Sequence, residues 1–165
     1  MTGKVAVVTG GAGGIGKATA LCLLDKGHQI ALFDLSEERL NSFEKSYRSK
    51  YPGRIFVHPV DVSNPGQVRA AIEETEKSAG PVFYLVNAAG VFPETEFTAV
   101  SIEEWERVIR INLTGTFLTC QAAAAKMIGR RAGSIVNLSS RLGFCGTAGH
   151  SAYSAAKAGV VAAVL

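Results

Sequence analysis

Short apolar runs alternate along the chain with longer segments whose apolar residues recur every three or four positions. Continuous apolar runs are typical of strands buried on both faces of a sheet, and the wider spacing is typical of helices that cover those faces. We predict strands at residues 5–8, 29–33, 55–57, 82–86 and 134–138. Helices are predicted at residues 15–26, 36–49, 64–79, 101–128 and from 151 to the last residue. This alternation predicts a single domain over residues 1–165, of the α/β class, with a doubly wound parallel sheet.

Local signals indicate where some of these helices begin and which side they bury. Ser101, with Glu104 three residues later, predicts a capping box at the start of the fourth helix. We expect a kink in this long helix, because Asn112 and Gly115 lie inside it. Helical spacing predicts the buried sides of the first and third helices as Ile15, Ala18, Thr19, Cys22 and Leu23, and Val68, Ala71, Ile72 and Thr75.

Composition and charge narrow the class of protein. The chain is 47% hydrophobic and 19% charged, with a formal net charge of +3 from scattered basic residues, so we expect no nucleic-acid partner. No apolar run approaches the ~18 residues of a membrane span, and the N-terminus lacks a signal-peptide pattern, so a cytoplasmic protein without a membrane partner is expected. The three cysteines, Cys22, Cys120 and Cys145, have no CxxC spacing, and neither they nor the histidines predict a metal site.

A glycine-rich segment, Thr9 to Gly16, connects the first predicted strand to the first predicted helix. Glycines there permit a tight turn and a close backbone approach to a pyrophosphate, and the helix N-terminus supplies free N–H groups. The alternative is a flexible glycine turn without a ligand. The strand before the segment and the helix after it favour dinucleotide binding.

Asp34 ends the second predicted strand, eighteen residues after Gly16. A carboxylate near this spacing typically accepts a hydrogen bond from the ribose 2′-hydroxyl, and it repels a 2′-phosphate. The position therefore favours NAD over NADP, although Lys17 and Arg39 are basic candidates for the extra phosphate. The alternative role for Asp34 is to cap the helix that begins near Ser36.

The most informative segment lies between Ser139 and Lys157. Tyr153 and Lys157 are four residues apart and would share one face of a helix. A free tyrosine titrates near ~10, and a neighbouring cation favours the phenolate, so the pair would suit acid/base catalysis near neutral pH. The alternative is a pair of ordinary surface neighbours. The hydroxyl of Ser140 could polarise the oxygen that Tyr153 protonates.

Together these motifs resemble the short-chain dehydrogenase/reductase family, in the right order and over the whole chain. The resemblance implies a Rossmann-type dinucleotide-binding domain. It implies a catalytic set of Asn112, Ser140, Tyr153 and Lys157, in which Ser140 is chosen over Ser139 because the family serine usually lies thirteen residues before the tyrosine. The segment Asn87–Gly90 resembles a motif that stabilises the central sheet. The implied cofactor-binding residues are Gly10, Gly14, Ile15, Gly16, Asp34, Asp61, Val62, Asn87, Ala88, Gly90, Tyr153 and Lys157.

The resemblance implies an NAD-dependent oxidoreductase of the simple branch, which interconverts a secondary alcohol and a ketone and forms a homodimer or homotetramer. Gly10, Gly13 and Gly16 also fit the extended branch, so an NAD-using epimerase or dehydratase is one alternative. A dinucleotide-binding module without catalysis is the other. Because family members continue past the helix of Tyr153, we expect a sheet that lacks the last strands, and a 165-residue chain that is weakly active or inactive alone.

Overall fold

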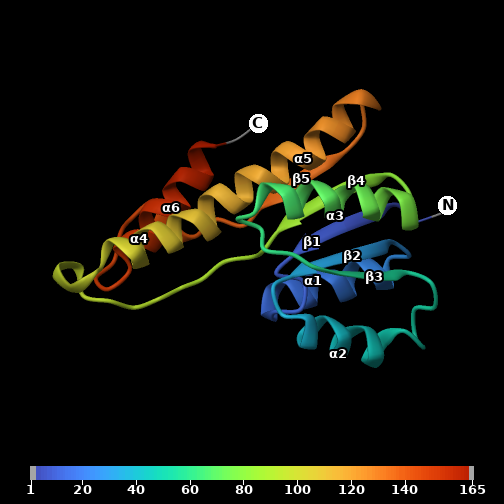
Figure 1. The fold of residues 1–165 in the computed structure, drawn as a ribbon, viewed down its shortest axis with the longest axis horizontal. Coiled ribbons are helices and arrows are strands. Elements are labelled where there is room, and N and C mark those ends of the chain that lie inside the picture. The colour runs from blue at the N-terminus through green and yellow to red at the C-terminus, as the bar shows by residue number, and fades with distance from the viewer. Residues whose placement is uncertain (1–2, 164–165) are drawn as a thin grey trace.

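The computed structural model describes residues 3–163 and contains one sheet of five parallel strands in the order β3-β2-β1-β4-β5 (Figure 1). The strands are β1 (Val5–Thr9), β2 (Gln29–Asp34), β3 (Ile55–Pro59), β4 (Val82–Asn87) and β5 (Ser134–Asn137). The helices are α1 (Gly14–Asp25), α2 (Glu37–Tyr47), α3 (Pro65–Ser78), α4 (Ile102–Ile109), α5 (Gly115–Gly129) and α6 (Ser151–Ala162). The doubly wound α/β fold is therefore confirmed, and the direction of winding reverses between β1 and β4.

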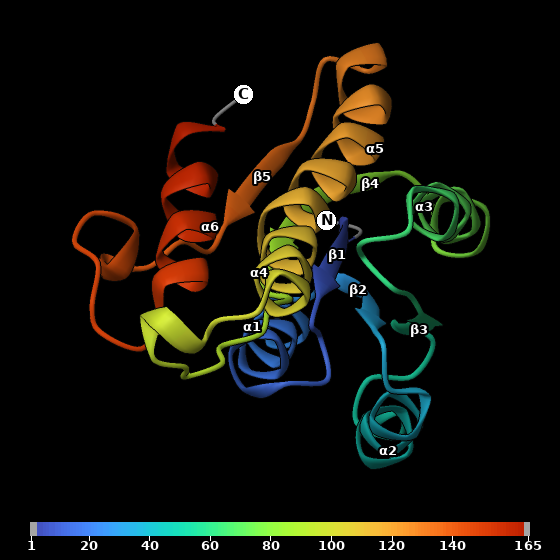
Figure 2. The same cartoon turned by 60° about the vertical axis from the view of Figure 1, so that its left-hand side comes forward.

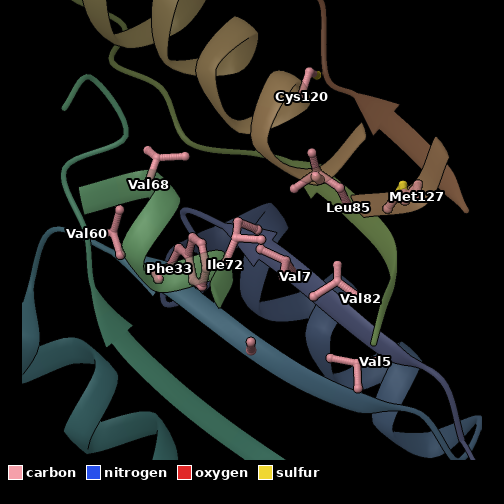
Figure 3. Packing of buried hydrophobic residues seen from close by; sticks show 13 residues of the cluster. Val5, Val7, Phe33, Val60, Val68, Ile72, Val82, Leu85, Cys120 and Met127 are labelled. Carbon is pink, nitrogen blue, oxygen red and sulfur yellow. The ribbon is translucent and has the colours of Figure 1, made fainter. Parts of the chain in front are cut away.

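Helices cover both faces of the sheet, as the apolar strands require (Figures 1 and 2). On one face α1 and α2 pack on β1 and β2, with Leu24, Leu32 and Leu40 fully buried between them. On the other face α3 and α5 contribute Ile72 and Met127 to a second core (Figure 3). Its strand residues include Val5, Val7, Phe33, Val82 and Leu85, and most of these side chains are completely buried.

The predicted buried side of α3 is confirmed, but that of α1 is wrong. Val68, Ala71, Ile72 and Thr75 are all buried in α3. In α1 the buried residues are Gly16, Ala20 and Leu24, while Ile15 is 66% exposed. A glycine at the centre of the contact lets α1 lie close to the preceding loop, and a pattern of apolar side chains does not register it.

The long helix that was predicted over residues 101–128 is interrupted at the expected place. Ser101 caps α4 by accepting a hydrogen bond from the backbone N–H of Glu104 at 3.1 Å. The capping box is not reciprocal, because the Glu104 carboxylate accepts from the Thr95 hydroxyl instead. A five-residue π-helical turn, Arg110–Thr114, then separates α4 from α5 and contains Asn112.

The last helix, α6, lies beside α4 (Figures 1 and 2). Ala152 and Ala156 of α6 form a small buried cluster with Val108 of α4. The predicted helix to the last residue ends instead at Ala162, and residues 164 and 165 lie outside the described part of the chain. Within residues 3–163, no helix has both the length and the apolar character needed to cross a membrane.

Candidate active site

The loops that follow β1 and β4 meet where the strand order reverses. Gly10 has a φ of +61°, and a Cβ atom there would lie only 2.8 Å from the Cα atom of Ala89. A Cβ atom on Gly16 would lie 2.2 Å from the carbonyl oxygen of Gly10, so the loop after β1 also folds tightly onto the start of α1. Glycine is therefore required at both positions by the close backbone contacts.

The beginning of α1 presents backbone donors rather than side chains. A Cβ atom on Gly14 would meet no atom within 4 Å, and Gly14 and Ile15 are exposed. Gly13 is the N-cap residue, and the first turn carries no acidic side chain to neutralise the helix dipole. Backbone N–H groups at an open helix N-terminus fit a phosphate, so this loop has the form that a pyrophosphate would need.

Asp34 is held rigidly at the end of β2. Its side chain is only 4% exposed and accepts hydrogen bonds from the backbone N–H groups of Ala12 at 3.2 Å and Ser36 at 3.1 Å. The Arg39 guanidinium forms an ion pair with the same carboxylate at 2.8 Å, and the Arg39 side chain is 58% exposed. Asp34 thus contacts both the glycine loop and Ser36, the N-cap residue of the next helix.

A cleft of about 170 Å³ opens between these loops, at the carboxyl ends of β1, β2 and β4. Five of the predicted cofactor-binding residues are among those that line it. Its lining residues are Gly10, Phe33, Asp34, Leu35, Arg39, Val60, Asp61, Val62, Ala89, Gly90, Val91 and Ile111. Two larger hollows, of about 540 and 330 Å³, lie along α5. None of the four predicted catalytic residues lines these hollows or the cleft.

The segment after β3 supplies one wall of the cleft. The Asp61 carboxylate accepts hydrogen bonds from the backbone N–H of Ser63 at 2.9 Å and from its hydroxyl at 2.7 Å. The Val62 side chain lies against Gly115, where a Cβ atom would be 2.8 Å away. The sharp turn after β3 therefore holds both residues at the rim.

Asn87 is 4% exposed and organises a buried polar cluster beneath the rim. Its amide oxygen accepts from the Thr119 hydroxyl at 2.7 Å, and its amide nitrogen donates to the Asn137 side chain at 2.9 Å. The Thr9 hydroxyl bridges to this cluster by donating to Asn87 and accepting from the backbone N–H of Ala88. Asn87 thus links β1, β4, β5 and α5 from inside the sheet.

Lys157 ties α6 to the end of β5. Its ammonium donates to the backbone carbonyl of Leu138 at 2.6 Å, and the Ser139 hydroxyl donates to the carbonyl of Lys157 at 2.8 Å. Lys157 is 6% exposed, and burial lowers the pKa of its ammonium. The ammonium nitrogen lies 5.6 Å from the centre of the Tyr153 ring, so the two residues are neighbours on one face of α6 as predicted.

Ser140 lies in the same segment, at the start of a short 3₁₀ turn, Arg141–Gly143. Its hydroxyl oxygen accepts a hydrogen bond from the backbone N–H of Leu142 at 3.2 Å. A Cβ atom on Gly143 would lie 2.8 Å from the backbone of Lys157, so this turn is pressed against α6. The Ser140 segment and the Tyr153–Lys157 pair therefore lie together.

Asn112 stands apart from this pair, because its side chain is committed to the loop after β4. It is completely buried, accepts from the backbone N–H of Val91 and donates to the carbonyls of Val91 and Val108. A Cβ atom on Gly90 would lie 2.5 Å from the Asn112 amide oxygen. Asn112 therefore joins the π-helical turn to the rim of the cleft.

Sequence reasoning did not find the aromatic residue that borders Tyr153. Phe92, in the loop after β4, packs edge-to-face with Tyr153 and stacks on His150. Sequence reasoning also did not identify Leu138, which contributes its backbone carbonyl as the acceptor for Lys157. No residue type marks a backbone acceptor, and only the proximity of His150 to Tyr153 in the sequence hinted at the aromatic group. Within residues 3–163, no group of His, Cys, Asp or Glu side chains is suited to hold a metal ion.

Comparison with known proteins yields consistent similarities. A family model described as short chain dehydrogenase matches residues 4–164. The chain is 37% identical over 161 residues to a 3-oxoacyl-[acyl-carrier-protein] reductase FabG of Thermotoga maritima, covering 98% of this chain and 65% of that protein. It is 38% identical over 158 residues to a 3-oxoacyl-[acyl-carrier-protein] reductase of Rattus norvegicus, covering 96% of this chain and 65% of the relative.

A solved structure of a short chain dehydrogenase from Mycobacterium smegmatis superposes with a TM-score of 0.93 at 37% identity. That match covers 98% of this chain and 68% of the other. The chain thus spans about 65% of the length of the curated relatives described above.

Proposed function

Because the chain belongs to the short-chain dehydrogenase/reductase family, we propose that it provides the cofactor site and acid/base group of an NAD(H)-dependent oxidoreductase that interconverts a secondary alcohol and a ketone. The observation that carries this proposal is the position of Lys157. Its buried ammonium lies beside the Tyr153 ring and binds the end of β5, next to the segment of Ser140. A phenol, an ammonium and a hydroxyl gathered in this way suit proton transfer to a carbonyl oxygen.

In the proposed reaction Tyr153 is the acid/base residue. In the reducing direction its phenol gives a proton to the substrate oxygen, and in the oxidising direction it takes the proton back. The nearby Lys157 ammonium favours the ionised form of a phenol. Ser140 donates its hydroxyl proton to the substrate oxygen, because its oxygen already accepts from Leu142. Asn112 acts as a positioning residue that holds the loop after β4 and the π-helical turn.

The cofactor supplies the hydride acceptor or donor when it is bound. We propose that the exposed start of α1, at Gly14 and Ile15, holds its pyrophosphate, with Gly10 and Gly16 allowing the tight turn. Asp61 and Val62 would flank the adenine at the wall of the cleft, and Gly90 would line the opposite side. Ala88 does not line the cleft but belongs to the same loop as Gly90, where its backbone N–H donates to the Thr9 hydroxyl. Asn87 would act from below by holding the strands that carry these loops.

We propose NAD rather than NADP as the cofactor. Asp34 lines the cleft, and its carboxylate is fixed by two backbone N–H groups, so it cannot turn away from an incoming ribose. A fixed negative charge favours ribose hydroxyls and repels a 2′-phosphate. Arg39 partly balances this charge through its ion pair, which makes the comparison of the two cofactors informative.

The first experiment is a fluorescence titration of the chain with NADH, beside one with NADPH. The proposal requires tight NADH binding and weaker NADPH binding. Equal or tighter NADPH binding would overturn the assignment of Asp34, and binding of neither would refute a working cofactor site in these residues.

The second experiment tests catalysis with the variant Tyr153→Phe. Removal of the hydroxyl should abolish turnover of a ketone panel, including a 3-oxoacyl thioester suggested by the relatives' names, while NADH affinity stays within twofold. General acid/base groups contribute roughly 10²- to 10⁴-fold to rates, so the loss should be easy to measure. NADH binding without turnover on the panel, both in this chain and in one extended to the length of the relatives, would favour the non-catalytic binding module. Bound NAD that is not consumed would favour an epimerase or dehydratase.

We further propose a homodimer or homotetramer. The outer side of α5 carries Phe117, which is 51% exposed, and Ile128, which is 74% exposed, beside an apolar hollow of about 330 Å³. Apolar surface of this kind is stabilised when a second copy covers it. Light scattering coupled to gel filtration would test this, and a monomer at all concentrations would contradict it.

A further inference from the structure

Phe92 lies between two aromatic rings at the beginning of α6. Its ring stacks on the imidazole of His150, with centroids 4.1 Å apart and planes inclined by 16°. It also meets the Tyr153 ring at 4.6 Å in an edge-to-face arrangement with an interplanar angle of 74°. Despite both contacts, 58% of Phe92 remains exposed. An apolar surface is thus held open directly beside the proposed acid/base residue.

The loop that carries Phe92 is fastened on both sides of it. Asn112 binds the backbone N–H and carbonyl of Val91, the residue before Phe92. His150 binds the carbonyl of Pro93, the residue after it, through Nδ1 at 2.9 Å. A carbonyl only accepts, so Nδ1 carries the proton in this contact. The backbone N–H of Thr95 adds a hydrogen bond to the carbonyl of Gly149 at 2.8 Å.

These contacts mean that the position of Phe92 is set before any ligand arrives. A rigid ring loses little conformational freedom on binding, and preorganised groups contribute more to affinity than mobile ones. Because the Phe92 and Tyr153 rings lie 4.6 Å apart, a substituent of a carbonyl compound whose oxygen reaches Tyr153 can contact Phe92. Aromatic rings pack favourably on one another, in offset or edge-to-face geometry, beyond the gain from buried area alone.

We propose that Phe92, held in place by His150, is a substrate-binding residue that selects carbonyl compounds with a planar aromatic group next to the carbonyl carbon; this rests on the proposed function. Phe92 contacts the substituent, and His150 is a positioning residue that acts through Phe92. The competing explanation is that the aromatic cluster only stabilises the loop.

The test compares acetophenone with cyclohexyl methyl ketone, two ketones of similar size of which only the first is flat and aromatic. Their affinities for the NAD-loaded chain are measured by saturation-transfer NMR. The parent chain should bind acetophenone up to roughly tenfold more tightly, which is the range of one aromatic pair. Phe92→Leu should remove this preference, and Phe92→Tyr should retain it.

Matched variants separate selection from simple stabilisation of the loop. Phe97→Leu alters a phenylalanine that is 77% exposed in the same connection between β4 and α4, and it should leave the preference unchanged. His150→Ala should reduce the preference, whereas His150→Phe should restore it because a ring again supports Phe92. If the role of Phe92 were purely structural, Phe92→Leu would lower the affinities for both ketones equally, and that result would overturn the inference.

NADH affinity, measured by fluorescence in the same samples, distinguishes the two proposals. Parent chain that binds NADH but shows no preference for acetophenone would refute the inference alone. Parent chain that fails to bind NADH would refute the proposed function and the inference with it. A Phe92→Leu protein that does not bind NADH would be replaced by Phe92→Met, with the same expected loss of preference.

Discussion

The ammonium of Lys157 donates a hydrogen bond to the backbone carbonyl of Leu138 at 2.6 Å, across the junction of α6 and β5. The bond places a buried positive charge beside Tyr153 and joins the last described helix to the sheet. One side chain therefore has both an electrostatic and a structural part in the site.

Lys157→Met removes both the charge and the hydrogen bond, and two measurements, of stability and of turnover, report on them. The variant loses the bond to Leu138 but no longer buries a charge, and such changes often leave stability nearly unchanged. We expect the free energy of unfolding to change by less than about 1.5 kcal/mol in urea denaturation, the size of one ordinary hydrogen bond. Turnover should fall by roughly a hundredfold or more, as for loss of an acid/base function. Unchanged turnover would contradict the role of Lys157.

Asp34→Asn tests cofactor selection. The amide keeps an oxygen that accepts from Ala12, but the negative charge is removed and Arg39 is released from its ion pair. Removing a repulsive charge a few ångströms from a phosphate is worth about 1 kcal/mol or more near a surface, so the NADPH-to-NADH affinity ratio should rise at least about fivefold. Asp25→Asn is the control, because Asp25 pairs with Lys50 at an exposed site and its loss should leave the ratio unchanged.

Asn87→Ala should be among the most destabilising substitutions at the rim. It removes the hydrogen bonds that Asn87 makes with the Thr119 hydroxyl and the Asn137 side-chain oxygen. The Thr119 hydroxyl still donates to the Gly115 carbonyl, and the Asn137 oxygen still accepts from the Cys120 thiol. Two lost hydrogen bonds of about 0.5–1.5 kcal/mol each predict a loss of roughly 1–3 kcal/mol by chemical denaturation. Thr119→Val removes one of these bonds and should cost about half as much. Equal stability of Asn87→Ala and the parent chain would show that the cluster contributes little.

The buried position of His58 leads us to expect that the free energy of unfolding falls in mild acid. Burial lowers the pKa of its imidazole, and Phe33 packs against the ring edge-to-face. In the unfolded chain His58 takes up a proton near its ordinary value of about 6.5, before the folded chain does. Stability attributable to His58 is therefore present above about pH 6.5 and is lost as pH falls from there through the lowered folded-state pKa.

His58→Phe should remove this part of the pH dependence while keeping an aromatic ring against Phe33. Thermal melts of both proteins at pH 7 and pH 5 would measure it. A parent chain whose melting temperature falls no more than that of the variant would contradict the prediction.

The sequence allowed the strands and most helix starts to be predicted, because their causes are local. Each strand is a short apolar run, and Ser101 and Asn64 cap their helices through their own side chains. The site residues could be assigned to one rim because parallel strands all end there. By contrast, the buried side of α1 depends on how closely Gly16 approaches Gly10, which is a tertiary contact.

Contacts made through the backbone were also beyond prediction. The Leu138 carbonyl accepts a hydrogen bond from the Lys157 ammonium, and the Pro93 carbonyl accepts one from the His150 imidazole. Any residue type would supply the same backbone acceptor. The stacking of Phe92 on His150 joins segments almost sixty positions apart, and neither segment has a repeating pattern that reveals its partner.

The π-helical turn between α4 and α5 also determines how α5 is rotated about its axis relative to α4. Val108, before the turn, packs against α6, whereas Thr119, after the turn, forms a hydrogen bond with Asn87. The two helices therefore present different faces to different neighbours. Each helical residue adds a rotation of ~100° about the helix axis, so deletion of a single residue at Asn112 would rotate α5 about its axis by that amount. The turn should therefore accept exchanges of exposed residues such as Arg110 far more readily than any change in its length.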